Sequence, residues 1–346
     1  MAIGRDENNM RYQALSIAEK SAYSQINHAL SSFADTIDIT GIDKKVDIQR
    51  VIEAVLADNP QFFYINPSQM AVVSSLSRRQ LRLSGGVRKS QAMRMLNEIH
   101  TVAKPLIEKA VQSGHSSYEQ LLSIYESLQE RTTYDNEELN AVARGKPRRL
   151  NAHNAYGAFV ERSAVCDGFA AAFQFLSQQM GYRCTIISGK SDHPSYGSVA
   201  HSWNIIEIAG QYYHVDPTWD ANHYADNREH SYDWFLVDDE HILTDHTWDV
   251  NTTPVAADDS MLWHLKKRLL VNSETEIVDV FAKAAQNPSK PIYLRCTERV
   301  WSNKAMDEYL SELLLNTALK FHSKAEISYS WDENTGCFFG RFVLVS

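Results

Sequence analysis

Cysteine is scarce in this sequence, and its four copies are far apart: Cys166, Cys184, Cys296 and Cys337. They form no C-x-x-C pair, which excludes a zinc ribbon and a dithiol redox motif, and they are too few for a disulfide scaffold. The histidines match no metal-ligand spacing. We therefore expect reduced thiols, a cytoplasmic location for the sequence as given, and no metal or cofactor. An exported protein whose signal peptide had been removed would show the same pattern.

Long apolar runs and clustered basic residues are also missing. No run of about eighteen apolar residues occurs, so we expect no transmembrane helix. The net charge is -9, and the one basic cluster, residues 146–149, is short. Phosphate binding needs clustered Lys and Arg. We therefore expect neither nucleic acid nor an anionic membrane as a partner.

The chain has 346 residues, more than one hydrophobic core usually serves. Apolar periodicity predicts an N-terminal α+β accessory domain (1–113), a central domain (114–254) and a C-terminal α+β domain (255–346). In the first domain we expect helices at 10–32, 44–56 and 89–111 and strands at 62–65, 70–73 and 80–83. In the second, a helix capped by Ser116 precedes a long polar loop that extends to residue 152. In the third, helical and strand-like periods alternate, with a hairpin turn at 332–336.

Cys166 lies where an amphipathic helix is predicted to begin. The apolar positions that follow recur at helical spacing: Phe169, Phe173, Leu176 and Met180. A thiol in the first turn is exposed to the partial positive charge of unpaired backbone N–H groups, which favours the thiolate. Because a single cysteine is more often a small buried residue, its role must be decided by the segments downstream.

Two strands, 201–208 and 211–216, are separated by Ala209-Gly210, which predicts a tight hairpin. In that register Trp203 lies opposite Asp216, and His201 becomes the diagonal neighbour of Asp216 on one sheet face. An aspartate that accepts one imidazole N–H leaves the other nitrogen free to deprotonate a thiol. Cysteine, histidine and aspartate together are the pattern of nucleophilic catalysis by cysteine. His214 lies on the same face, so geometry alone leaves two candidate bases.

Three segments resemble, in order, the three motifs of the transglutaminase-like superfamily: Val165-Cys166-Asp167-Gly168-Phe169, His201-Ser202-Trp203-Asn204 and residues 213–220. The resemblance covers about residues 118–250 and leaves both ends of the chain uncovered. It implies a papain-like α+β core, in which the cysteine helix packs on an antiparallel sheet. It also implies a catalytic triad: Cys166 as nucleophile, His201 as general base and then acid, and Asp216 as the residue that orients His201.

Attack on an amide carbonyl also needs donors for the oxyanion that forms. The backbone N–H of Cys166 is the expected first donor. Asn154 and Tyr156, in a segment that resembles bacterial members of the family, are candidates for the second, with a core or loop role as the alternative. Trp203 and Trp219 are candidate walls of the acyl pocket, again with core packing as the alternative. We expect residues 191–200 to form a flexible loop beside the pocket.

The sequence thus predicts a bacterial transglutaminase-like cysteine enzyme that forms a thioester on Cys166 with the acyl group of a protein or peptide substrate. Release of the acyl group to water, as in a peptidase, amidase or deamidase, is the favoured outcome. Transfer to an amine, as in an acyltransferase that crosslinks protein glutamines, is the alternative within the same chemistry. A non-catalytic binding or assembly module that kept the fold is the alternative from another class. The sequence gives no oligomeric state.

Overall fold

The computed structural model describes residues 6, 9–66, 69–83, 87–112, 114–146, 148–193, 197–227, 229–267, 269–288, 291–297, 306–321, 325–332 and 336–344. The chain forms two compact units. One consists of Met1–Phe235 and His246–Ala257, and the other of Leu236–Asp245 and Asp258–Ser346. The sequence-based division into three domains stays a prediction.

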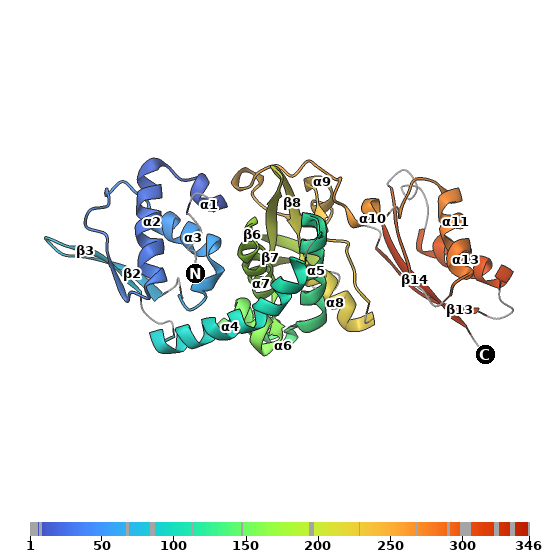
Figure 1. Ribbon diagram of the computed structural model, residues 1–346, viewed down its shortest axis with the longest axis horizontal. Coiled ribbons are helices and arrows are strands. Elements are labelled where there is room, and N and C mark those ends of the chain that lie inside the picture. The colour runs from blue at the N-terminus through green and yellow to red at the C-terminus, as the bar shows by residue number, and fades with distance from the viewer. Residues whose placement is uncertain are drawn as a thin grey trace. The chain divides into compact units, whose positions relative to one another are not determined.

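The N-terminal part of the first unit has its own hydrophobic cluster, which includes Tyr23, Ile26, Val51 and Leu81. Its helical elements are α1 (Met10–Gln13), α2 (Ile17–Ser31), α3 (Ile48–Asp58) and the 3-10 turn η2 (Pro60–Phe62). Its sheet has the order β1-β3-β2, with β1 (Thr36–Asp38), β2 (Met70–Ser74) and β3 (Arg79–Leu83) (Figure 1).

Two predictions for this part need correction. The helix expected at 10–32 is interrupted, because Ser16 caps α2 through a capping box with Glu19. The strand expected at 62–65 is wrong, since η2 occupies its start. Pro60 fixes the first backbone angle of that turn and suits it to a helical position.

The rest of the first unit is an α+β core, as the sequence predicts. The main sheet has the order β10-β6-β7-β8-β9, with β6 (Arg183–His193), β7 (Gly197–Ile208), β8 (Gln211–Val215), β9 (Phe235–Val237) and β10 (His246–Thr247). Of β9, only Phe235 belongs to the first unit. Its helices are α4 (Lys89–Ala110), α5 (Ser117–Arg131), α6 (Asn136–Ala143), α7 (Cys166–Gln179) and α8 (Pro217–Asn227). Shorter elements are β4 (Thr133–Tyr134), η4 (Leu150–His153), the π-helical turn η5 (Gly157–Glu161), β5 (Ser163–Ala164) and η6 (Val250–Thr252).

The helix that begins at Cys166 packs on the sheet (Figure 1). Asn204 of β7 donates its amide to the Ala170 carbonyl at 3.0 Å. Gln174 of α7 donates to the Cys184 carbonyl of β6 at 3.1 Å. Phe169 and Phe173 are fully buried on the same helix. The expected arrangement, a cysteine-bearing helix on an antiparallel sheet, is confirmed.

The hairpin between β7 and β8 has the predicted register, with Ile205 opposite His214. Ala209 and Gly210 both have positive φ, 52° and 84°. Such backbone angles belong to the two-residue turns whose twist matches that of the flanking strands. The local turn chemistry therefore sets which side chains share a face with Asp216.

Two segments expected to be loops contain regular structure. Residues 191–193 end β6 and residues 197–200 begin β7, so the described part of the expected loop at 191–200 belongs to a hairpin. The expected loop before residue 152 contains α6, which Asp135 caps by accepting the Glu138 N–H at 2.9 Å. The polar composition of both segments concealed these elements.

A close backbone approach holds η4 against the first turn of α7. A Cβ atom added at Gly168 would lie 2.7 Å from the Ala152 carbonyl oxygen and 2.7 Å from the Ala164 Cβ. Real Cβ atoms do not come so close to their neighbours. Glycine at this position therefore permits the contact that brings His153 beside the first turn of α7.

The second unit is also α+β. Its sheet has the order β11-β12-β14-β13, with β11 (Leu270–Val271), β12 (Ile292–Cys296), β13 (Ala325–Asp332) and β14 (Cys337–Leu344). Its helices are α9 (Asp239–Ile242), α10 (Trp263–Lys266), α11 (Glu274–Ala285) and α13 (Met306–Phe321). A hydrophobic cluster that includes Phe281, Leu310 and Phe338 joins α11 and α13 to the sheet. The expected turn at 332–336 falls mainly on residues 333–335, which lie outside the described residues.

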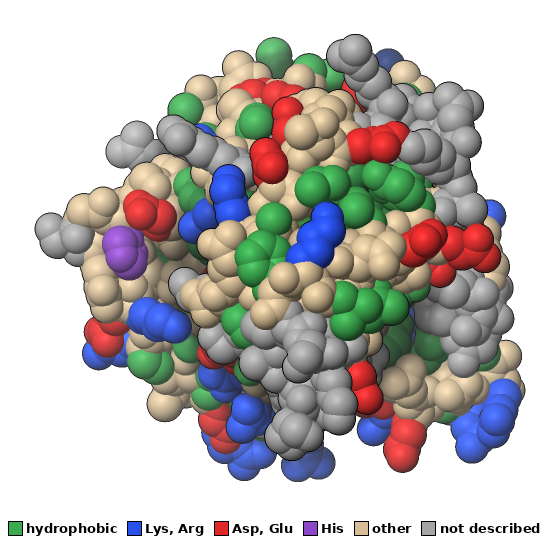
Figure 2. Space-filling model, turned by 90° about the vertical axis from the view of Figure 1, so that its right-hand side faces the viewer, with side chains coloured by type: hydrophobic (Ala, Val, Ile, Leu, Met, Phe, Trp, Pro, Cys, Tyr) green, Lys and Arg blue, Asp and Glu red, His purple; other side chains and the backbone are tan. Residues whose placement is uncertain are grey.

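The part of the surface drawn in Figure 2 carries both positive and negative side chains. On the face that Figure 2 shows, acidic and basic side chains are interspersed among hydrophobic ones. No helix in the described part of the chain is long and apolar enough to cross a membrane.

We predict that Gly168→Ala lowers the free energy of unfolding by about 1–3 kcal/mol, because the added methyl group must push η4 away from α7. Gly41→Ala is the control, since nothing lies within 4 Å of a Cβ at Gly41. Urea unfolding of both variants and the unchanged protein measures the difference. Equal stability of the two variants would show that the contact is not tight.

Candidate active site

The predicted histidine–aspartate pair is present and buried. His201 Nε2 lies 2.7 Å from Asp216 Oδ2, and the two residues are 6% and 0% exposed. The Cys166 side chain is close enough to His201 to raise the pKa of its imidazole. Because Nε2 faces Asp216, Nδ1 is the ring nitrogen left for the thiol. Cys166 is half-buried at the first position of α7.

The electrostatics of this group favour a protonated His201 beside an ionised Asp216. Burial lowers the pKa of the His201 imidazole, but the Asp216 carboxylate and the Cys166 side chain outweigh burial, and the net pKa lies well above its ordinary value. Burial raises the pKa of Asp216, yet hydrogen bonds and charge from His201 and His246 hold it well below its ordinary value. The aspartate is therefore a carboxylate, and His201 binds its second proton strongly.

A second histidine contacts the same carboxylate oxygen. His246 Nε2 lies 3.2 Å from Asp216 Oδ2, and its side chain is fully buried. Of the described residues in the first unit, His201, Asp216 and His246 are the group whose ligand atoms converge well enough to hold a metal ion, all within 4.8 Å of one another. The separations of 2.7 and 3.2 Å between Asp216 Oδ2 and the two Nε2 atoms are hydrogen-bond distances. We therefore interpret the cluster as a hydrogen-bonded one.

A neutral carboxylic acid supports Asp216 from behind. The Tyr125 hydroxyl lies 2.8 Å from the Asp216 carbonyl oxygen and 2.6 Å from Asp220 Oδ2, but it has only one proton to donate. Both contacts are satisfied if Asp220 is protonated and donates to Tyr125. Burial and the neighbouring Asp233 raise the pKa of Asp220 to about 8. Asp220 therefore keeps its proton to a much higher pH than Asp216, which is charged.

A cavity of about 510 Å³ opens above Cys166 and His201, both of which line it. Much of its wall is apolar, with contributions from Tyr134, Leu139, Val142, Val165, Val199 and Trp219. Polar groups gather on the side of α6 and η4, where Glu138, Arg148, His153 and Asp167 line the cavity. Space for a substrate therefore lies directly over the thiol.

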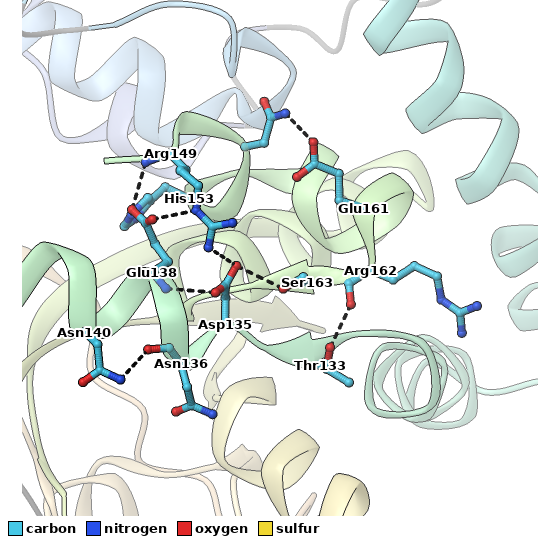
Figure 3. A network of polar contacts seen from close by, with 11 residues as sticks. Thr133, Asp135, Asn136, Glu138, Asn140, Arg149, His153, Glu161, Arg162 and Ser163 are labelled. Atoms are coloured by element: carbon cyan, nitrogen blue, oxygen red, sulfur yellow. Dashed lines mark hydrogen bonds and ion pairs between the residues drawn. The ribbon is translucent and has the colours of Figure 1, made fainter. Parts of the chain in front are cut away.

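A polar network adjoins this side of the cavity (Figure 3). Arg149 donates to Asp135 Oδ2 at 2.6 Å and to Glu138 Oε2 at 2.9 Å. His153 contacts Glu138 Oε1 at 3.2 Å and Asp167 Oδ2 at 2.8 Å. The network joins α6 and η4 to the residue that follows the nucleophile.

The structure separates the remaining predicted site residues. Trp219 lines the cavity, with its ring 5.6 Å from that of His201. Trp203 is fully buried and donates a hydrogen bond to His214 at 3.1 Å, so it belongs to the core. It is not among the described residues that line the cavity. The same bond places His214 beside Trp203, while His201 is the histidine at Cys166.

Asn154 and Tyr156, the candidate oxyanion donors, have other partners. Asn154 donates to the Leu150 carbonyl at 2.7 Å. Tyr156 donates to Glu98 of α4 at 2.6 Å. Neither is among the described residues that line the cavity. The geometry therefore gives no support to an oxyanion role for either side chain.

Sequence reasoning missed several residues of the site. Tyr134 reaches the cavity because β4 and β5 pair in parallel, which places it opposite Ala164, two residues before Cys166. His246 joins Asp216 through β10, which pairs with β6. Both depend on two-residue strands, for which a sequence carries little signal. Asp167 and Ser202 were inside the recognised motifs, and their adjacency to Cys166 and His201 was a usable signal.

Comparisons with known proteins found a matching family profile, similar proteins and similar solved structures. A family profile described as the transglutaminase-like superfamily matches residues 104–217. Over 121 residues the chain is 26% identical to the kyphoscoliosis peptidase of Mus musculus and 23% identical to that of Homo sapiens. Each match covers 33% of this chain and 17% of the length of the relative.

Similar solved structures include a protein described as a TGase, with a TM-score of 0.33 and 14% identity over 43% of each chain. Another is described as a candidate cysteine protease of Cytophaga hutchinsonii, with a TM-score of 0.27 and 14% identity. That likeness covers 43% of this chain and 61% of the other.

We predict that Asp220 makes the protein less stable as the pH rises from 5 to 7. Its folded pKa of about 8 exceeds the unfolded value of about 4, so the unfolded state loses this proton first. The contribution of Asp220 to the free energy of unfolding is complete below about pH 4. Between that pH and 8 it falls by about 1.4 kcal/mol per pH unit.

Urea unfolding between pH 5 and 7 measures this slope. Asp220→Asn removes the titrating group and should flatten the slope by that amount. Asp192→Asn, at an exposed position, should leave it unchanged. Identical slopes in the Asp220→Asn variant and the unchanged protein would show that Asp220 is ionised in the folded state.

Proposed function

We propose that this chain, whose residues 104–217 match the profile of the transglutaminase-like superfamily, is a cysteine enzyme acting on protein or peptide amides. The reaction passes through a thioester on Cys166, and water releases the acyl group. One observation carries the proposal: Cys166 and His201 line the same substrate-sized cavity, His201 is hydrogen-bonded to Asp216, and the Cys166 side chain is close enough to His201 to raise its pKa.

In the proposed first half-reaction, the Cys166 thiolate attacks the amide carbonyl carbon and forms a tetrahedral oxyanion. The His201 imidazolium then gives its proton to the leaving amine, the C–N bond breaks, and a thioester remains. In the second half-reaction, neutral His201 removes a proton from water, which attacks the thioester. The resulting tetrahedral intermediate collapses, the C–S bond breaks, and the acid leaves as the Cys166 thiolate and the His201 imidazolium are restored. Asp216 holds the imidazole orientation throughout.

The oxyanion needs donors above the thiol. Cys166 is the first residue of α7, where backbone N–H groups have no partner within the helix. Tyr134 is our candidate for the second donor in place of Asn154 and Tyr156, because it lines the cavity and interacts electrostatically with Cys166. Burial and nearby negative charge raise the Tyr134 pKa, so its hydroxyl keeps the proton that a donor needs.

Two observations favour water as the acyl acceptor. Asn136, Asn140, Asn222 and Arg148 line the cavity and offer polar groups to water. The similar proteins of Mus musculus and Homo sapiens are named peptidases.

We predict that a thiol-alkylating agent such as iodoacetamide modifies Cys166 and spares the other cysteines. Cys184, Cys296 and Cys337 are at most 5% exposed, whereas Cys166 lines the cavity. Intact-mass and peptide mapping measure the site. His201→Ala should slow the reaction at pH 6 at least tenfold, because the imidazolium no longer stabilises the thiolate. Labelling of Cys184 first, or an equal rate in the variant, would contradict the nucleophile assignment.

We further predict that a peptide library incubated with the protein gives hydrolysis products, and that Cys166→Ala abolishes them. A primary amine included in the mixture separates the two acceptors by mass. Cleavage or a deamidation shift supports hydrolysis, whereas incorporation of the amine as the main product would make the protein an amine transferase. No product, with biological activity unchanged in Cys166→Ala, would favour a binding module.

A further inference from the structure

The ring of His153 lies between two carboxylates. Its Nδ1 is 2.8 Å from Asp167 Oδ2, and its Nε2 is 3.2 Å from Glu138 Oε1 (Figure 3 shows the Glu138 side). An ionised carboxylate only accepts hydrogen bonds, and an imidazole donates from both nitrogens only when it carries both protons. The geometry therefore requires an imidazolium if both acids are ionised.

The pKa directions agree with this assignment. Burial raises the pKa of Glu138 and of Asp167, but the hydrogen bonds from Arg149 to Glu138 and from His153 to both acids outweigh burial, and each pKa lies below its ordinary value. Burial lowers the pKa of His153, yet Asp167 and Glu138 outweigh it and the net pKa is raised. A fixed positive charge thus lines the cavity that contains Cys166.

The two acids depend on His153 to different degrees. Glu138 also accepts two hydrogen bonds from Arg149, one from the backbone N–H and one from Nε, both 2.9 Å long. Asp167 has a neutral second partner, the Ser202 hydroxyl at 2.6 Å, and Arg148 attracts it only through space. Loss of His153 would leave Glu138 paired and Asp167 without its hydrogen-bonded cation.

Asp167 and Ser202 are the sequence neighbours of the two reacting side chains. Asp167 follows Cys166 in the first turn of α7, and Ser202 follows His201 on β7. Their hydrogen bond therefore connects the helix that carries the nucleophile to the strand that carries the base. It runs parallel to the contact between Cys166 and His201 themselves.

We propose that His153 is a positioning residue of this site, a protonated imidazole that holds Asp167 on Ser202 and offsets the Asp167 charge beside the Cys166 thiolate. The inference rests on the proposed role of Cys166 as nucleophile. His153 binds one carboxylate oxygen of Asp167 and Ser202 binds the other. His153 itself takes no part in the chemical step.

Electrostatics give the direction of the expected effect. Glu138, Asp167 and Arg148 interact with His153, and Arg149 is bonded to Glu138. The charged or titratable groups around Cys166 include His201, Tyr134 and Asp167. Removal of the His153 charge leaves Asp167 as an uncompensated negative group next to the thiolate, so a higher pH is needed to form the thiolate.

The test is the rate of Cys166 alkylation by iodoacetamide as a function of pH, with the site confirmed by peptide mapping. His153→Gln should move the midpoint of this profile upward by about one pH unit. The double variant His153→Gln/Asp167→Asn should return the midpoint to within a few tenths of a unit of the starting value, because no uncompensated carboxylate remains. A residue that only fills space would not be rescued in this way.

His230→Gln is the matched control, since His230 also pairs with a carboxylate, that of Glu130 at 3.3 Å, and is not among the described lining residues. Its midpoint should not move. Asp167→Asn alone keeps the test decisive if His153→Gln does not fold, which circular dichroism would reveal. Its midpoint should equal the starting value or fall below it, and a rise would overturn the proposal.

The remaining outcomes are also distinct. An unshifted midpoint in folded His153→Gln, or a shift that persists in the double variant, overturns the role of His153 and leaves the proposed function standing. Absence of selective Cys166 alkylation in the unchanged protein overturns both. A shift in His230→Gln equal to that in His153→Gln would assign the effect to general charge and also overturn the proposal.

Discussion

The buried carboxylate of Asp216 is the constraint on which the site depends. A charge removed from water is costly unless polar partners replace its hydration. Asp216 receives His201 and His246 at Oδ2 and the Thr218 N–H at Oδ1, 2.8 Å away. These partners come from β7, β10 and α8. The sheet and its covering helix must therefore be complete before the aspartate can be ionised and orient the base.

The surroundings of Asp216 lower its pKa and raise that of the neighbouring acid, Asp220. Asp220, one helical turn later, stays protonated and supplies a donor through Tyr125 to the Asp216 backbone. Two ionised carboxylates at this depth would repel each other. A neutral Asp220 can still hold Tyr125 against the Asp216 carbonyl oxygen. It adds no negative charge that would compete with Asp216 for His201. On the other side of the cavity, Asp167 is charged and has its own cation in His153.

Much of this site was predictable from the sequence because its determinants are local. The Ala209-Gly210 turn fixes the register of β7 and β8, and the register places His201 beside Asp216. Contacts through two-residue strands were not predictable: Tyr134 arrives through β4 and His246 through β10. The helix α6 was hidden because its sequence is polar and a single cap, Asp135, begins it. The prediction of a strand after Pro60 was wrong because proline favours a helical turn at that position.

The ion pair between Asp135 and Arg149, 2.6 Å long, closes the chain segment that contains α6. Both ends of that segment are fixed, and Leu139 and Val142 inside it form part of the cavity wall. A segment closed at its base resembles the compact surface loops that carry function in many proteins. Leu139 and Val142 can therefore change the shape of the wall while Asp135, Glu138 and Arg149 keep the polar network beside Cys166 in place.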